Sequence, residues 1–309
     1  MPRRLLAFPL LAVAAAAAAQ PCGGNGVAVQ VLGSGGPELA AKRAHSSYLV
    51  WIDGKARVLI DTGSGTALRF TESGASFADL DVVLFTHLHA AQTVDLPAFV
   101  QASKFEARNR PLPLYGPAAG RGMPSTIGFV RDLFDTTRGT YRHLGEFISP
   151  LDKSSYKLEP HDVREPPPKL GAPRRAAPTI LAVFKNERPR ARAVSVTYGT
   201  APALAWRIEA GNKGLVFAGD GDGDGLVPLA EQADLLLARP LVAATDAAPA
   251  GHLPPARLGE IAQAAKARRL VLALRAPPTP GREDETLAAI RKNYSGPVEL
   301  ADDLSCYRP

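Results

Sequence analysis

The sequence predicts a layered α/β fold in which mixed β-sheets pack against helices. Strand-like apolar runs alternate with helical patterns along the chain, and two of these runs are separated only by a tight-turn dipeptide. Helical crossovers are typical of parallel strands, whereas a tight turn requires an antiparallel pair, so mixed sheets are favoured. With 46% apolar and 21% charged residues over 309 positions, the composition excludes a mainly disordered chain and a polytopic membrane protein.

The first third of the chain carries the antiparallel part of this fold. Residues 26–32 alternate weakly and end in a glycine-rich loop, which indicates a strand followed by a tight turn. Residues 47–52 and 55–60 are rich in β-formers and flank Asp53-Gly54. Asp-Gly between apolar runs is typical of a two-residue hairpin, so these runs are expected to pair. Residues 81–85 form a short, continuous apolar run, as a buried strand does.

The middle of the chain predicts two helices, one strand and a long loop. Residues 94–107 have helical spacing with a proline in the first turn, and residues 129–134 are part of a second helix. Residues 112–115 form the strand between them. Residues 150–178 are rich in proline and charge, which is poor material for a core, so an exposed insertion or loop is expected there.

The last third returns to alternation of strands and helices. Apolar runs predict strands at residues 179–184, 193–197, 203–209, 214–218 and 269–274. Helical patterns cover residues 255–267 and 283–293, and an amphipathic segment, residues 228–238, leads into three consecutive leucines. No boundary interrupts this series, so residues 20–309 are expected to form one domain.

The N-terminus resembles an export signal. Arg3 and Arg4 precede an apolar stretch over residues 5–19 that ends in an Ala-x-Ala site, so residues 1–19 are expected to be a signal peptide. The stretch is too short for a comfortable membrane span, which predicts a periplasmic or secreted protein without a stable span after cleavage. An uncleaved anchor or a buried helix is the alternative. Loss of Arg3 and Arg4 lowers the net charge from +6 to +4, which weakens any argument from charge to nucleic acid.

Cysteine usage agrees with export. The two cysteines are Cys22, just after the expected cleavage site, and Cys306, near the C-terminus. An even count in an exported protein predicts a disulfide, here one that ties together the ends of the mature chain. Two free thiols are the alternative.

Two histidines follow a buried strand at a spacing suited to metal binding. His87 and His89 are two residues apart, which places both side chains on one face of an extended chain. Two imidazoles that converge in this way can share one metal ion. A pair that is hydrogen-bonded in the core is the alternative for an isolated His-x-His.

The surrounding sequence resembles the metallo-β-lactamase superfamily. Leu-Phe-Thr-His-Leu-His-Ala-Ala-Gln-Thr-Val-Asp-Leu-Pro at residues 84–97, Leu-Ile-Asp-Thr-Gly at 59–63 and Val-Phe-Ala-Gly-Asp at 216–220 look like its motifs. Residues 32–37 and 203–209 are similar to the ribonuclease Z and arylsulfatase branch. The resemblance covers nearly the whole mature chain. It implies a four-layer αββα sandwich with a metal site at one edge of the two sheets.

The resemblance also implies which residues would hold metal. The family motif Thr-His-x-His-x-Asp-His matches at Thr86, His87 and His89, and the bridging aspartate falls at Asp220. His252 matches a histidine that assists catalysis in this branch. The other four ligand positions are substituted, at Ala91, Gln92, Tyr198 and Leu274.

The remaining ligands limit the metal content. The second metal site keeps only Asp220, whereas the first keeps His87, His89 and Asp220. Two histidines and one carboxylate suit zinc or iron, so at most one such ion per chain is expected, and none is the alternative. If active, the protein would hydrolyse an ester, sulfate-ester or phosphoester bond by metal-bound hydroxide, with Asp220 and His252 in catalytic roles. The alternative is a metal-free periplasmic binding protein that takes a small molecule in the same cleft.

Two further patterns are weaker signals. Asp220, Asp222, Asp224 and Glu231 have the spacing of a calcium loop, but they follow a strand rather than a helix, so calcium is disfavoured. Basic residues collect at Arg174, Arg175, Lys185, Arg188, Arg190 and Arg192. Few aromatic residues lie among them, so a solvated surface is favoured over a nucleic-acid groove. The sequence does not define the oligomeric state.

Overall fold

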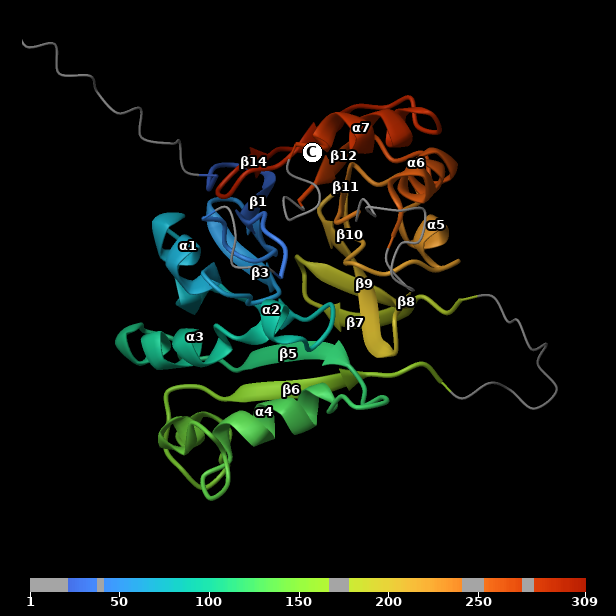
Figure 1. Cartoon of the computed structure of the whole chain (residues 1–309). Helices are drawn as coiled ribbons and strands as arrows, with labels where there is room; N and C mark the ends of the chain where they lie inside the picture. Colours follow the sequence, from blue (N-terminus) through green and yellow to red (C-terminus); the bar gives the residue numbers. More distant parts are fainter. Residues whose placement is uncertain (1–21, 38–41, 167–177, 241–252, 274–280) are drawn as a thin grey trace, which may run out of the picture.

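Two mixed β-sheets with helices on their outer faces make up the structure (Figure 1). The computed structural model describes residues 22–37, 42–166, 178–240, 253–273 and 281–309. The expected signal peptide, residues 1–19, lies outside these ranges. Along the described part of the chain no helix is long and apolar enough to cross a membrane.

The first sheet contains the N-terminal half of the chain and the last strand. Its strand order is β14-β1-β2-β3-β4-β5-β6. The strands are β1 (Val27–Gly33), β2 (Ser47–Ile52), β3 (Lys55–Ile60), β4 (Val82–Leu84), β5 (Leu112–Pro117), β6 (Leu158–Val163) and β14 (Cys306–Tyr307). β2 and β3 form the antiparallel hairpin that the Asp-Gly dipeptide predicts, whereas β3 to β6 are parallel. Asp53 and Gly54 both have positive φ, as this hairpin turn requires.

The second sheet contains the C-terminal half in the order β13-β12-β11-β10-β9-β8-β7. Its strands are β7 (Leu181–Lys185), β8 (Arg190–Tyr198), β9 (Ala201–Ala210), β10 (Lys213–Phe217), β11 (Leu235–Ala238), β12 (Leu270–Leu272) and β13 (Val298–Leu300). β7 to β10 are antiparallel, and β10 to β13 are parallel. Both sheets are therefore mixed, as the sequence predicts.

Short helices connect the strands. They are α1 (Thr66–Glu72), α2 (Ala90–Thr93), α3 (Leu96–Ala102), α4 (Thr126–Phe134), α5 (Leu226–Leu229), α6 (Pro255–Ala264) and α7 (Glu283–Arg291). The described residues also form 3₁₀ helices at η1 (Phe77–Asp79), η2 (Ser103–Phe105) and η3 (Arg142–Phe147). The helix expected over residues 94–107 is shorter, because its last turns form η2.

Three separate apolar clusters hold four layers together. In β2, Leu49 and Trp51 point outward and pack with Phe70 of α1 and Phe99 of α3. Tyr48 and Val50 of the same strand point inward and pack with the second sheet. The third cluster joins the outer face of that sheet to the C-terminal helices, through residues such as Val216, Ile261 and Ile290. Apolar interfaces on both faces of each sheet define the αββα sandwich that the family resemblance implies.

The expectation of an exposed insertion or loop over residues 150–178 is partly wrong. Residues 158–163 of the 150–178 range form β6, which pairs with β5 over six residues. Leu158 and Val163 at its ends are buried, while the central side chains are partly exposed at the edge of the sheet. The polar and proline content that predicts a loop is thus tolerated because β6 is an edge strand. Residues 167–177 of the range lie outside the described part.

The C-terminal segment fastens the first sheet. β14 pairs with β1, and Cys22 and Cys306 form the predicted disulfide across 284 residues. Asp303 adds a polar anchor, since its carboxylate accepts hydrogen bonds from Ser34 N at 2.9 Å and Ala44 N at 2.9 Å, and from Arg69 Nε at 3.1 Å. The last residues therefore hold three separate N-terminal segments.

Candidate functional site

Within the described ranges, the residues predicted for the metal site lie at one edge of the two sheets. His87 and His89 follow β4, and Tyr198 ends β8. Asp220 follows β10, directly after Gly219, which has positive φ. Because parallel strands direct their carboxyl ends to the same edge, residues distant in sequence meet there.

The histidine loop is fixed from both sheets. Asp61 accepts hydrogen bonds from Thr86 N and Thr86 Oγ1, each at 2.7 Å. From the second sheet, Leu204 N donates to Thr86 O at 2.8 Å and Trp206 Nε1 donates to Phe85 O at 3.0 Å. Burial raises the pKa of Asp61 to about 7, although the hydrogen bonds from Thr86 act to lower it. The histidines thus project from a rigid loop.

His87, His89, Tyr198 and Asp220 are brought together as the sequence suggests. The rings of His87 and His89 are 5.0 Å apart, and that of Tyr198 lies 4.7 Å from His87 and 5.6 Å from His89. His87 Nε2 is 3.8 Å from Asp220 Oδ2. Burial, followed by the Asp220 charge, raises the pKa of Tyr198, so its hydroxyl stays neutral at pH 7.

Arg239 is a central residue of this site that the sequence analysis missed. Its Nη1 lies 3.0 Å from Asp220 Oδ1, and both side chains are more than nine-tenths buried. Burial acts to lower the pKa of Arg239, but the charges of Asp220, Tyr48 and Asp61 raise it above its usual value. The sequence carries no specific signal for it, because the pairing of β10 with β11, which brings Arg239 beside Asp220, is visible only in the structure.

A cleft of about 500 Å³ opens above these residues. Three of the substituted ligand positions, Ala91, Gln92 and Tyr198, line it, together with His45, His89, Asp220 and Arg239. Gly63 lets α2 approach closely, because a Cβ there would collide with Ala91 O. His45, which no spacing in the sequence singles out, is therefore also a cleft residue.

The side chains around the cleft do not fit a metal ion. Across the described ranges, no three His, Cys, Asp or Glu side chains are grouped so that they could share one. Asp220 already has a cationic partner in Arg239 at 3.0 Å. Ala91 offers no ligand atom in its side chain, and Gln92 is a weak neutral one. His252 and Leu274, the other two residues named by the resemblance, lie outside the described ranges.

The calcium-like motif does not bring its carboxylates together. Asp220 pairs with Arg239, whereas Asp222 lies 3.6 Å from Arg257. The Asp222 carboxylate also accepts a hydrogen bond from Gly223 N at 2.7 Å. Asp224 and Glu231 are exposed. Two of the four side chains are thus neutralised by arginines rather than directed at one centre.

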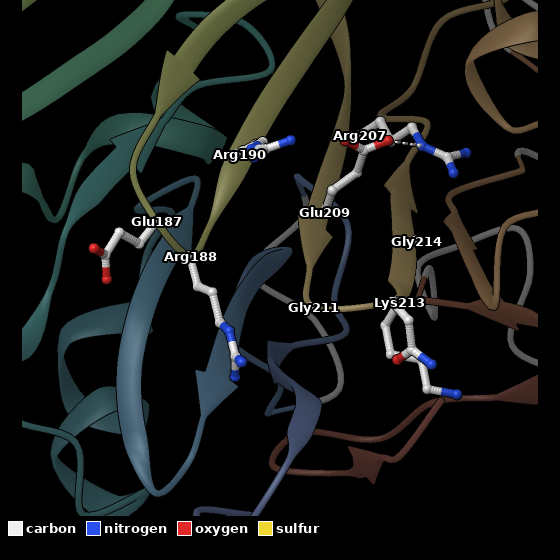
Figure 2. Close-up of a pocket in the computed structure, with 9 residues that line it drawn as sticks. Glu187, Arg188, Arg190, Arg207, Glu209, Gly211, Lys213 and Gly214 are labelled. Carbon is white, nitrogen blue, oxygen red and sulfur yellow. Dashed lines mark hydrogen bonds and ion pairs between the residues drawn. The ribbon is translucent and has the colours of Figure 1, made fainter.

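Two of the basic residues, Arg188 and Arg190, line a groove at the opposite edge of the second sheet, together with Arg207 and Lys213 (Figure 2). β8 runs from Arg190 in this groove to Tyr198 in the cleft, a separation of roughly 26 Å for a nine-residue strand. Acidic residues offset the charge, since Glu209 pairs with Arg192 and Arg207, each at 3.4 Å, and Asp53 pairs with Arg188 at 3.5 Å. The groove, of about 390 Å³, is therefore of mixed charge and remote from the cleft. Arg174 and Arg175 lie outside the described part of the chain.

The fold, with its site at one edge of the two sheets, is that of a metallo-β-lactamase-type domain. The family profile of the metallo-beta-lactamase superfamily matches residues 41–278, and the chain belongs to this superfamily of hydrolase-fold proteins. Ribonuclease Z of Thermobifida fusca (strain YX) is 28% identical over 296 residues, which cover 89% of this chain and 92% of that protein. Ribonuclease Z of Mycobacterium bovis (strain BCG / Pasteur 1173P2) is 29% identical over 302 residues, covering 89% and 96%.

Solved structures support the same fold. The metallo-beta-lactamase fold protein YhfI from Bacillus subtilis superposes with a TM-score of 0.67 at 23% identity, covering 91% of this chain and 98% of that one. The short form of human tRNase Z gives a TM-score of 0.65 at 21% identity, with the same coverage. The resemblance read from the sequence is thus confirmed for the fold and the family.

Proposed function

We propose that this chain is a metal-independent member of the superfamily that binds a small molecule in the cleft. The observation that carries the proposal is the buried ion pair between Arg239 and Asp220, whose charged atoms are 3.0 Å apart. Arg239 supplies a fixed positive charge to the aspartate that would otherwise bridge metals. The negative charge of Asp220 at the base of the cleft is therefore balanced without a metal ion.

Electrostatics oppose a metal beside this pair. A divalent ion about 4 Å from the Arg239 guanidinium would meet roughly 8 kcal/mol of repulsion at an effective dielectric constant of about 20. Its attraction to Asp220 would be offset by that repulsion. Arg239 is part of the chain, directly after β11, so its charge stays beside Asp220, whereas a metal ion would first have to bind.

A one-metal hydrolase is the second candidate. The proximity of His87 to Asp220, 3.8 Å between Nε2 and Oδ2, favours it, as does the family's hydrolase chemistry. In that case zinc or iron would be held by His87, His89 and Asp220, and an ester, sulfate-ester or phosphoester would be the substrate. Arg239 would then have to leave Asp220, which its burial opposes.

Metal content separates the two candidates. Wild-type protein and the His89→Ala variant are dialysed against a weak chelator, loaded with zinc or iron, washed, and measured by elemental analysis alongside ester and phosphodiester turnover. We expect less than about one-tenth of an ion per chain in both proteins and no turnover. One retained ion in the wild type that is lost in the variant would establish the hydrolase instead.

We also propose that the protein is exported and acts on a small molecule rather than on RNA. The disulfide between Cys22 and Cys306 supports export, because disulfides persist in oxidising compartments. The mixed charge of the remote groove gives little support for a phosphate-tracking surface. Binding of a tRNA precursor that weakens steeply with added salt would contradict this part of the proposal.

A further inference from the structure

A second hollow lies next to the cleft and is lined mainly by apolar side chains. It measures about 250 Å³. Its walls come from the histidine loop, α3, α4 and the residue before η3, through Leu88, Pro97, Phe129, Leu133 and Tyr141. We call this hollow the apolar groove. Phe129 is fixed against Phe85 with ring centroids 6.3 Å apart, so part of the wall is preformed.

The apolar groove and the cleft share part of their lining at the short helix α2. Ala90, its first residue, and Val94, which follows it, line both hollows. Val94 is 52% exposed and Tyr141 is 37% exposed, so large apolar side chains face water along this path. A ligand that covered them would gain the free energy of removing their surface from water.

The cleft end of this path offers hydrogen bonds. Arg239 Nε and Gln92 Oε1 are buried and have no hydrogen-bond partner among the described residues. One is a donor and the other an acceptor. Buried polar groups are normally satisfied, so the first atom calls for an acceptor and the second for a donor, and an amide or hydroxyl head can supply either. The Arg239 charge is matched by Asp220 at 3.0 Å, so the site does not need a charged partner.

We propose that the ligand is an uncharged amphiphile with a polar head and a hydrocarbon part. The head, of the amide or hydroxyl kind, lies in the cleft against Arg239 and Gln92. The hydrocarbon part crosses Ala90 and Val94 and lies in the apolar groove. This inference rests on the proposed binding function and names the class of molecule that the site takes.

A chain-length series tests the assignment. The probes are butanamide, hexanamide and octanamide, titrated into the full exported chain by calorimetry. Each added methylene that is buried should raise affinity about fourfold. Octanoate is titrated in parallel, and it should bind at least tenfold more weakly than octanamide because its charge lacks a partner in the cleft. No gain along the series, no binding of any amide, or tighter binding of octanoate would each overturn the proposal.

Two variants locate the hydrocarbon part. Val94→Asp alters an exposed residue of the path, and Phe105→Asp is the matched control, since Phe105 is 86% exposed and does not line the groove. Val94→Asp should weaken octanamide binding at least tenfold, while the control matches the wild type. Tyr141→Ser, which alters the apolar groove but not the cleft, should also weaken octanamide binding and leave butanamide binding nearly unchanged. If all variants bind octanamide as the wild type does, the assignment of the apolar groove is wrong. This outcome is independent of the metal analysis, so the ligand class and the metal-free cleft can each be rejected without the other.

Discussion

Replacing Arg239 by methionine tests whether an internal cation stabilises the cleft. Methionine keeps the apolar stem of the side chain and removes the charged guanidinium with its hydrogen-bond donors. Asp220 would then be left in a site where its side chain is 8% exposed, with only His87 Nε2, 3.8 Å from Oδ2, as a described charge partner. Breaking a buried ion pair by removing one partner costs about 3–5 kcal/mol.

The protein contains a matched control for this change. Arg257 and Asp222 are 3.6 Å apart, with side chains 35% and 34% exposed, so Arg257→Met removes a similar pair at the surface. Exposed pairs contribute about 0–1 kcal/mol. In urea unfolding followed by circular dichroism, Arg239→Met should lower the midpoint by roughly 1–2 M, for a slope of about 3 kcal/mol per molar. Arg257→Met should hardly move it.

The double variant Asp220→Asn with Arg239→Met isolates the pair. Removing both charges leaves no uncompensated carboxylate, so the double variant should be more stable than the sum of the single changes predicts, by at least about 1 kcal/mol. If Arg239→Met and Arg257→Met have equal midpoints, the buried pair does not stabilise the cleft and the reasoning fails.

Two further predictions concern pH and the disulfide. The pKa of Asp61 is about 7 in the folded protein, above its ordinary value of 3.8, so the folded state binds this proton more tightly. Stability should therefore fall by up to about 4 kcal/mol as pH rises from 4 to 7 and then level off. Asp61→Asn should flatten that slope in urea titrations, and an unchanged slope would assign the effect elsewhere. Replacing Cys22 and Cys306 by serine should lower the free energy of unfolding by roughly 5 kcal/mol, from the chain entropy of the long loop. Intact mass after alkylation of the unreduced wild type should show no added label. Two labelled thiols would reject the disulfide.

The sequence predicts the fold well where local signals and burial agree. The hairpin of residues 47–60 is predicted with its bounds because Asp53-Gly54 sets the turn and both strands are apolar. β6 is missed because an edge strand needs few apolar residues, and its pairing partner, Leu112 of β5, is remote in sequence. β14 has only two residues, so no period could reveal it.

The site is predicted only as far as its motif extends. His87, His89, Tyr198 and Asp220 meet as the resemblance implies, because the motif fixes the loops that carry them. Arg239 belongs to no motif that the resemblance supplied, and its role depends on the parallel pairing of β10 with β11. A single arginine after an apolar run is indistinguishable in sequence from one that faces solvent, so tertiary pairing had to reveal it.

The way the C-terminus fastens the first sheet also dictates an order of assembly. Val29 of β1 pairs with Tyr307 of β14, and Asp303 bonds to the segments around Ser34, Ala44 and Arg69. In a chain synthesised from its N-terminus, Asp303 appears 269 residues after Ser34. Until the segment around Asp303 and Tyr307 has been made, β1 and the segments around Ser34, Ala44 and Arg69 lack these partners.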